Sequence, residues 1–313
     1  MDELLDLMIC RIPGLRGEER IELEKKFDNT GDLSILSKRD IESILGRDLK
    51  GLPWNMAGIR ALAEKDVTAA QRYGIKRVSW REQAYPPLLR EIYDPPLILF
   101  YRGLLPNPER PLVAMVGTRK PSSQGTGRAY TLGRELGEAG IPVVSGLALG
   151  IDAMAHRGNI EGKAPTVAVL GSGLDQVYPA SNRDLARRIL ESGGIIFSEY
   201  PPGTWPRKWN FPARNRIISA LARGTVIVEA PEKSGALITA RFALEQNRDL
   251  WVDRAGISSP RGAGTARLAE EGAGVISSAR DILEEWNMTG QKTNRKGETS
   301  LASSLAEYLE IKL

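Results

Sequence analysis

The feature that most constrains the fold is a series of short apolar runs, rich in β-branched residues, in the middle of the chain. The runs are PLVAMVG, IPVVSG, TVAVLG, GIIFSEY, TVIVEA and DLWVD, at 111–117, 141–146, 166–171, 194–200, 225–230 and 249–253. Continuous apolar runs of this length are typical of strands buried on both faces of a sheet. Segments with helical spacing lie between them, such as 123–139, which Gly140 ends. This alternation predicts an α/β fold with a doubly wound, mostly parallel sheet.

The rest of the chain is organised differently. A length of 313 residues exceeds the size at which single cores stop growing, about 250 to 300 residues, so we expect a second unit. Residues 1–72 contain short helical patterns broken by Gly and Asp/Asn, which predict a small all-helical accessory domain of helix-hairpin-helix or SAM-like type. Residues 73–286 form the predicted α/β domain. Residues 287–313 are polar and predict a linker with one short C-terminal helix, too short for a winged-helix domain.

The segment IPGLRG at 12–17 resembles a helix-hairpin-helix turn. The backbone amides of such a turn can meet a phosphate at a helix N-terminus. A purely structural helical cap fits the same residues, so both interpretations stay open.

Composition excludes several classes of protein. No run approaches the ~18 apolar residues of a membrane span, and the start MDELLDLMIC lacks the basic residues of a secretory signal, so we expect a cytoplasmic protein without membrane contact. One cysteine, Cys10, and one histidine, His156, exclude an internal disulfide and a His/Cys metal cluster. We expect no metal and no cofactor. The net charge of +4 is concentrated in 73–286, with 27 Lys/Arg against 22 Asp/Glu, whereas 1–72 hold 12 against 14.

Several strand ends lead directly into Gly- and Ser-rich turns followed by helices. They read VGTRKPSSQGTG from 116, VSGLALGID from 144, LGSGLD from 170 and VEAPEKSGALITAR from 228. Each turn places unpaired backbone amides at a helix N-terminus, where an anion can bind, and the carboxyl ends of parallel strands share one edge of the sheet. None fits GxGxxG or GxxxxGK[ST], so no dinucleotide or P-loop site is predicted. The alternative is that the glycines only let strands turn into helices.

The stretch WPRKWNFPARNRIISA, at 205–220, contains four basic residues, two tryptophans and a phenylalanine, and no carboxylate. It lies just before the predicted strand TVIVEA, at the same edge of the sheet. Cations that neutralise phosphates and rings that stack on exposed bases are what a single-stranded nucleic acid requires. The alternative for Trp205, Trp209 and Phe211 is burial beneath a proline-rich loop.

Seven motifs, taken in their order along the chain, strongly resemble those of the DNA-processing protein A family (DprA, also called Smf). They are VGTRKP, VVSGLALGIDAMAH, VAVLGSGLDQVYPASNR, SEYPPGTWP, FPARNRII, VIVEAPEKSGALITARFALEQ and GTARLAEEGA. The resemblance covers about 75–286. It implies an extended Rossmann-like fold that binds single-stranded DNA without catalysis, forms a dimer and loads the RecA recombinase onto DNA during natural transformation.

The resemblance also implies site residues at the positions that match its motifs. The implied DNA contacts are Gly117, Thr118, Arg119 and Lys120, then Ser145 and Gly146, then Arg183, then Arg214, Asn215 and Arg216, and finally Lys233, Ser234 and Gly235. A dimer or recombinase contact is expected near Leu268, Val275 and Ile276. His156 matches an AH dipeptide of the family, which leaves open whether it touches DNA or holds a loop.

Two segments depart from the family's pattern. This chain reads VDRAG at 252–256 where the family usually has VPG, and it has Ala266 where the motif GTN has an asparagine. The local loop geometry is therefore open at both places.

The alternative function is enzymatic. Related Rossmann-like folds bind nucleotides and cleave N-glycosidic bonds, and Glu199 or Glu229, at strand ends, would be the acid. His156 follows Asp152 by four residues, which places both on one helix face. No paired acid and base at recognisable spacing supports this alternative.

Overall fold

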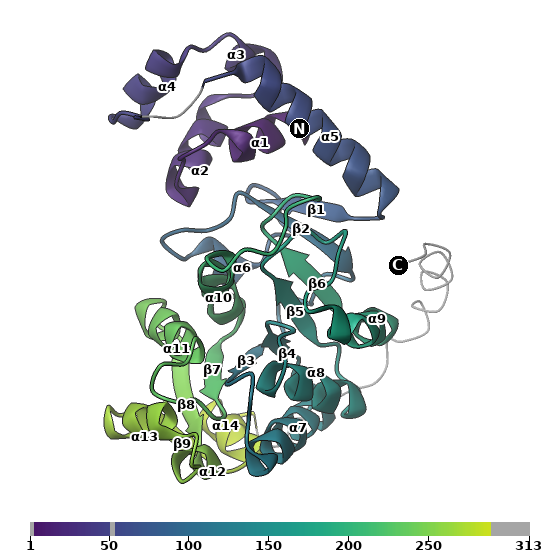
Figure 1. The fold of residues 1–313 in the computed structure, drawn as a ribbon, viewed down its shortest axis with the longest axis vertical. Helices are drawn as coiled ribbons and strands as arrows, with labels where there is room; N and C mark the ends of the chain where they lie inside the picture. Colours follow the sequence, from purple (N-terminus) through teal and green to yellow (C-terminus); the bar gives the residue numbers. More distant parts are fainter. Residues whose placement is uncertain (1–2, 51–53, 289–313) are drawn as a thin grey trace.

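The computed structural model describes residues 3–50 and 54–288 and has one continuous sheet with helices on both faces (Figure 1). The predicted linker and C-terminal helix lie, apart from 287 and 288, outside the described residues. No helix in the described part of the chain has the length and apolar character that a membrane span requires.

The sheet has nine strands in the order β1-β2-β6-β5-β4-β3-β7-β8-β9. Their bounds are β1 Lys76–Ser79, β2 Ile98–Gly103, β3 Val113–Val116, β4 Val143–Ser145, β5 Val167–Leu170, β6 Ile195–Ser198, β7 Gly224–Ile227, β8 Asp249–Asp253 and β9 Gly274–Ile276. The pairs β1/β2 and β2/β6 are antiparallel, and every other pair is parallel. The predicted α/β class with a mostly parallel sheet is confirmed, and all six predicted strands are present.

Helices cover the two faces of the sheet because strand side chains alternate between the faces. Val113 and Met115 of β3 pack with α7 (Ser123–Glu138), α8 (Ile151–Glu161) and α14 (Ala279–Glu285). Ala114 and Val116 pack instead with α10 (Asn210–Leu221) and α11 (Ala236–Glu245). The remaining helices of this part are α6 Pro87–Arg90, η1 Ala180–Asn182, α9 Arg183–Glu191, α12 Arg254–Ile257 and α13 Ala263–Glu270.

Five helices precede the sheet and gather at one end of the molecule, beside β1 and β2 (Figure 1). They are α1 Glu3–Arg11, α2 Gly17–Lys26, α3 Thr30–Ser34, α4 Lys38–Leu45 and α5 Met56–Arg72. Their apolar residues share a core with β2, in which Met8 and Ile59 belong to the same buried cluster as Phe100. The expected N-terminal helical region is therefore present.

The turn between α1 and α2 does not leave its amide free for a phosphate. The Gly17 N–H, at the start of α2, donates to the carboxylate of Asp94 at 2.7 Å. Asp94 in turn lies 3.0 Å from Nε of Arg216 on α10. At Gly17 the IPGLRG segment thus joins the N-terminal helices to the sheet domain, which fits the structural one of the two interpretations.

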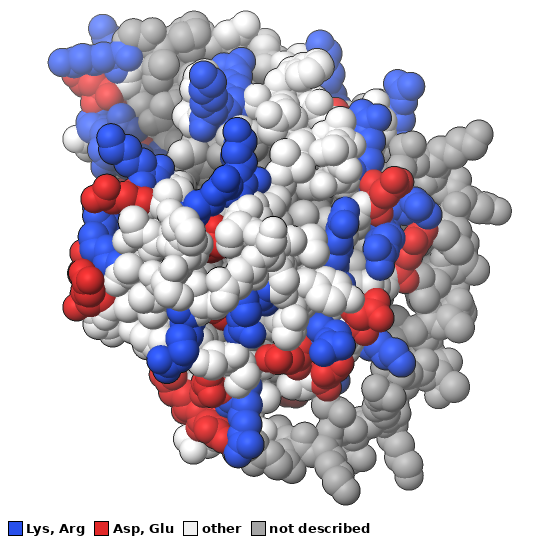
Figure 2. All heavy atoms as spheres, turned by 60° about the horizontal axis from the view of Figure 1, so that its bottom comes forward, with Lys and Arg blue, Asp and Glu red and all other residues white. Residues whose placement is uncertain are grey.

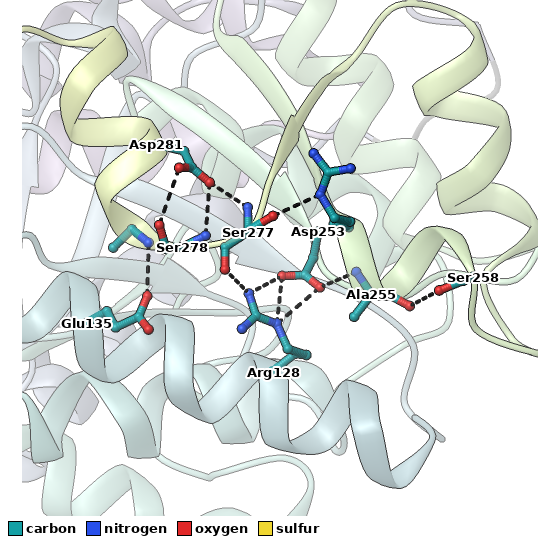
Figure 3. A network of polar contacts seen from close by, with 10 residues as sticks. Arg128, Glu135, Asp253, Ala255, Ser258, Ser277, Ser278 and Asp281 are labelled. Atoms are coloured by element: carbon teal, nitrogen blue, oxygen red, sulfur yellow. Dashed lines mark hydrogen bonds and ion pairs between the residues drawn. The ribbon is translucent and has the colours of Figure 1, made fainter.

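The VDRAG segment is held by a polar network between α7, β8 and the turn before α14 (Figure 3). Arg128 donates to both carboxylate oxygens of the fully buried Asp253, and also to the Ser277 carbonyl. Nε of Arg254 donates to the Ser277 hydroxyl at 2.9 Å. Asp253 and Arg254, which stand in VDRAG where the family usually has VPG, thus both form hydrogen bonds within the chain.

The GTA segment also has a structural role. The Thr265 hydroxyl accepts a hydrogen bond from the Ala230 N–H at 2.8 Å, and the Ala230 carbonyl accepts from Gly264 and Thr265. These bonds fix the start of the loop between β7 and α11.

Two of the three residues expected near a dimer or recombinase contact, Leu268 and Ile276, are buried within this chain. Leu268 is 6% exposed and Ile276 is 2% exposed, because both side chains pack into the core of this chain, while Val275 is 39% exposed. Only Val275 could contribute apolar area to a partner, so the dimer contact at these positions stays a prediction.

Candidate functional site

A small open pocket lies at the carboxyl ends of β3, β4 and β5, closed on one side by the first turns of α10. Its lining residues come from four segments and are Arg119, Gly146, Ala148, Leu149, Tyr178, Pro179, Phe211 and Arg214. The volume is about 60 Å³, far below the roughly 300 to 1,000 Å³ of sites that enclose a small molecule. A pocket of this size can take one phosphate group, with the remainder of a ligand outside it.

Cationic and aromatic groups form the rim of the pocket. The exposed Arg119 guanidinium lies 5.3 Å from the centre of the Phe211 ring. The Tyr178 ring lies 5.6 Å from the same ring, at an interplanar angle of 32°, and Tyr178 is 46% exposed. A guanidinium over a ring face is held by cation–π attraction, so the rim presents one positive charge and an exposed ring side by side.

Arg214 forms the floor of the pocket. Its side chain is buried, and Nη1 donates to the carbonyl oxygens of Gly146, at 2.9 Å, and Val169. Its Nε has no acceptor in the described part of the chain. Burial lowers the pKa of Arg214 to about 10, and the neighbouring Asp152 carboxylate opposes this shift. The guanidinium is therefore still charged at neutral pH and lies beside the Asp152 carboxyl group at the floor of the pocket.

Gly146 permits this arrangement. A Cβ atom at position 146 would lie 2.5 Å from Nη2 of Arg214 and 2.7 Å from Oδ2 of Asp152. Asp152 also accepts a hydrogen bond from the Gly146 N–H at 3.1 Å. Glycine is thus required at 146 because the two buried charged groups approach its backbone.

His156 holds the core and does not reach the pocket surface. It is fully buried on α8, with Nδ1 2.8 Å from the Thr166 hydroxyl, which itself donates to the Val143 carbonyl. Burial, with a smaller contribution from Arg214, lowers the pKa of His156 to about 3. The imidazole is neutral and braces α8 against the sheet, which answers the question that its motif left open.

Arg216, which we predicted to face a phosphate, is directed into the protein instead. Its guanidinium donates two hydrogen bonds to the Glu199 carboxylate, at 2.8 and 2.7 Å, and both side chains are 11% exposed. Glu199 and Asp94 raise the pKa of Arg216 against the effect of burial. Asn215, between the two arginines, is partly exposed and donates to the Gly235 carbonyl at 3.3 Å.

The other predicted site residues surround the pocket without lining it. Four of them are exposed: Lys120 on the loop after β3, Arg183 at the start of α9, and Lys233 and Gly235 on the loop after β7. Two predicted residues are engaged within the sheet edge: the Thr118 N–H donates to the Glu229 carbonyl, and the buried Ser145 hydroxyl donates to the Met115 carbonyl. Gly117 fits closely below Ile151, and Ser234 accepts from the Ala236 N–H at the start of α11.

Both carboxylates proposed for the enzymatic alternative are bound by other groups. Glu229 is fully buried and accepts from the N–H and hydroxyl of Ser122, at 3.0 and 2.5 Å, at the start of α7. It occupies the crevice between β3 and β7. The helices that follow these two strands, α7 and α11, lie on opposite faces of the sheet, and open α/β sheets usually bind ligands at such a point. Glu199 is paired with Arg216. Neither is placed to protonate a leaving group.

Four lining residues, Ala148, Leu149, Tyr178 and Pro179, were not predicted from the sequence, and Tyr178 is the aromatic one among them. It stands in the YPASNR segment, in which the family resemblance implied only Arg183 as a contact. The available signal was an aromatic residue a few positions beyond the strand-end turn LGSGLD.

Charge on the surface is mixed. Figure 2 shows Lys and Arg side chains interspersed with Asp and Glu around an uncharged central area on the face it displays. In the part of the chain that the structure describes, no group of three His, Cys, Asp or Glu side chains is placed to hold a metal ion.

Comparisons with known proteins agree with this fold. The family model described as DNA recombination-mediator protein A matches residues 76–287. DNA processing protein DprA of Bacillus subtilis is 40% identical over 222 residues, which are 70% of this chain and 74% of that protein. The X-ray structure of DprA from Streptococcus pneumoniae is 34% identical with a TM-score of 0.75, covering 91% of this chain and 99% of that chain.

A second solved structure is that of DNA processing protein A from Helicobacter pylori, described as having a unique single-stranded DNA binding mode. It is 31% identical with a TM-score of 0.62, and the match covers 69% of this chain and 96% of that chain. The family model spans more than half of the chain and agrees with these relatives. The chain therefore belongs to the DNA recombination-mediator protein A family.

Proposed function

We propose that this protein binds single-stranded DNA at the pocket formed by Arg119, Phe211 and Arg214. The observation that carries the proposal is the exposed Arg119 guanidinium, 5.3 Å from the Phe211 ring, above the buried charge of Arg214. One phosphate would sit between the two guanidiniums, and the neighbouring base would stack on an exposed ring edge or face at Tyr178 or Phe211. The Helicobacter pylori relative, described as having a single-stranded DNA binding mode, supports this proposal.

The geometry favours a single strand over a duplex. A ring can stack only on a base that has left the helical stack, and stacking of this kind tolerates any base. The volume of about 60 Å³ favours a polymer that continues past the pocket over a free nucleotide, which a site normally encloses.

We assign the predicted contacts to three groups. Arg119, Lys120, Arg183 and Lys233 are exposed and would meet phosphates directly, with backbone groups of the Gly117, Gly146 and Gly235 loops beside them. Arg214 would act from the floor by its charge, and Arg216 by holding α10 in place through Glu199. Thr118, Ser145, Asn215 and Ser234 would shape the loops.

We further propose that the protein acts without catalysis, as a homodimer that loads the RecA recombinase onto the bound strand. The support for a role without catalysis is that Glu199 and Glu229 are both bound within the chain. Light scattering tests the dimer, and a strand-exchange assay with RecA tests the loading. A protein that stays monomeric at all concentrations, or that leaves RecA filament formation unchanged, would contradict these parts.

Fluorescence anisotropy with labelled oligonucleotides tests the proposed binding. The wild type should bind a single strand more tightly than a duplex of the same length. Arg119→Ala should weaken single-strand binding about tenfold, since a hydrogen bond or ion pair to a charged group is worth about 1.5 kcal/mol or more. The matched control is Arg280→Ala on α14, which removes an arginine that is 79% exposed and paired with Glu284. Equal losses in both variants would contradict the assignment of the site.

A further inference from the structure

Two tryptophans close to the pocket are not explained by it. Trp205 is 72% exposed and Trp209 is 65% exposed, in the loop between β6 and α10. Tryptophan has a large apolar ring that is highly buried on average. Two such rings, both exposed and only four residues apart in the sequence, indicate a surface that is covered by a ligand or partner.

The loop that carries them is fastened to the loop that carries Tyr178. The fastening bonds run from Gly173 N–H to the Thr204 carbonyl at 2.9 Å, from Gly203 N–H to Oδ1 of Asp175 at 2.8 Å, and from Nδ2 of Asn210 to the Gly171 carbonyl at 2.9 Å. Because the backbone on both sides of the tryptophans is fixed in this way, the loop loses little conformational freedom when a ligand covers the rings.

The charge around the two rings selects the kind of ligand. Arg207 and Lys208 lie between them in the sequence and are exposed, and the Arg207 guanidinium is 5.3 Å from the centre of the Trp209 ring. Residues 205–216 contain no carboxylate. The surface thus combines flat apolar rings with positive charge, and it continues along the chain into Phe211 at the phosphate pocket.

We infer that Trp205 and Trp209 form a second stacking platform, which holds bases of the same DNA strand beyond the pocket at Arg119. Arg207 and Lys208 would neutralise the phosphates of that part of the strand. This inference rests on the proposed function, and it extends the site from one phosphate to a segment of several nucleotides. The platform would not discriminate between sequences, because every base has a face that can stack.

Oligonucleotides with and without bases test the platform. The probes are a single-stranded oligo(dT) and an oligonucleotide of equal length in which the bases are removed but the sugar-phosphate chain is kept. The wild type should prefer oligo(dT), and the double variant Trp205→Ala, Trp209→Ala should lose at least about fivefold of that preference, which is the affinity that ~1 kcal/mol of stacking provides. Trp205→Phe with Trp209→Phe should keep most of it, because a ring remains.

The outcomes separate the inference from the proposed function. If the double alanine variant keeps the wild-type preference while Arg119→Ala loses binding, the platform is wrong and the proposed function stands. If Arg119→Ala also binds as the wild type does, both are wrong. An equal loss of affinity for both probes in a folded double alanine variant would also overturn the platform. Removing a stacking surface must weaken binding of oligo(dT) more than binding of the probe without bases. The result would then favour a protein partner for the two rings.

Discussion

The buried ion pair between Arg216 and Glu199 gives the most quantitative prediction of stability. In Glu199→Gln, one of the two short hydrogen bonds, at 2.8 and 2.7 Å, loses its acceptor, and the guanidinium keeps its charge at 11% exposure. Breaking a buried pair on one side costs about 3 to 5 kcal/mol. Asp94 remains 3.0 Å from Nε of Arg216, which limits the loss to the lower end, about 3 kcal/mol.

Thermal unfolding followed by circular dichroism measures this effect. A loss of about 3 kcal/mol lowers the Tm by roughly 6 to 12 °C, at about 2 to 4 °C per kcal/mol for a large domain. The matched control is Glu64→Gln, which breaks the Arg60–Glu64 pair, where the side chains are 50% and 54% exposed, and which should cost less than about 1 kcal/mol. Replacing both partners, with Glu199→Leu and Arg216→Met, should recover most of the loss. Equal Tm values for Glu199→Gln and Glu64→Gln would refute the reasoning.

Three further predictions concern groups around the pocket. Because burial lowers the pKa of His156 to about 3, below its unfolded value of about 6.5, the free energy of unfolding should fall as the pH drops from about 6.5 towards 3, with a slope of up to about 1.4 kcal/mol per pH unit. Urea unfolding at pH 7, 6 and 5 should show this slope in the wild type and a flatter one in His156→Gln. Gly146→Ala, whose Cβ would meet Arg214 and Asp152 at 2.5 and 2.7 Å, should cost about 1 to 3 kcal/mol of stability and weaken oligonucleotide binding in anisotropy titrations; an unchanged variant would show that the floor of the pocket is not packed as described. Glu229→Ala leaves the Ser122 N–H without its acceptor and should lower the free energy of unfolding by about 1 to 3 kcal/mol, whereas a neutral result would contradict the role of Glu229 at the start of α7.

The sequence predicted the architecture well because buried parallel strands have a strong local signature. The six apolar runs from 111 to 253 all form strands, and the turn GTRK places Arg119 on the pocket rim. Strands β1, β2 and β9 were missed. β1 and β9 have only four and three residues, too few for a clear apolar period. β2 has six residues, four of them buried, but it lies outside the series of apolar runs and helical segments that begins at 111. Strand formation there depends on neighbours that are distant in the sequence.

The directions of individual side chains could not be predicted in the same way. Arg214 and Arg216 were expected to face a phosphate together, but α10 is packed against α6, α11 and β5. Arg216 therefore points into the protein towards Glu199, whereas Arg214 lies buried at the floor of the pocket. Their charges are satisfied by carbonyl groups near Val169 and by Glu199, residues that no local pattern associates with α10. Trp205 and Trp209, for which burial was the alternative, are exposed.

The most direct test of the central claim is the salt dependence of single-strand binding. Each phosphate contact adds about 0.7 to the slope of log affinity against log salt concentration for a single strand. The wild type should therefore show a steep loss of affinity with rising salt, and Arg119→Ala should show a slope smaller by about 0.7, with Arg280→Ala unchanged. Identical slopes for wild type and Arg119→Ala, in folded proteins, would contradict the claim that Arg119 binds a phosphate of single-stranded DNA.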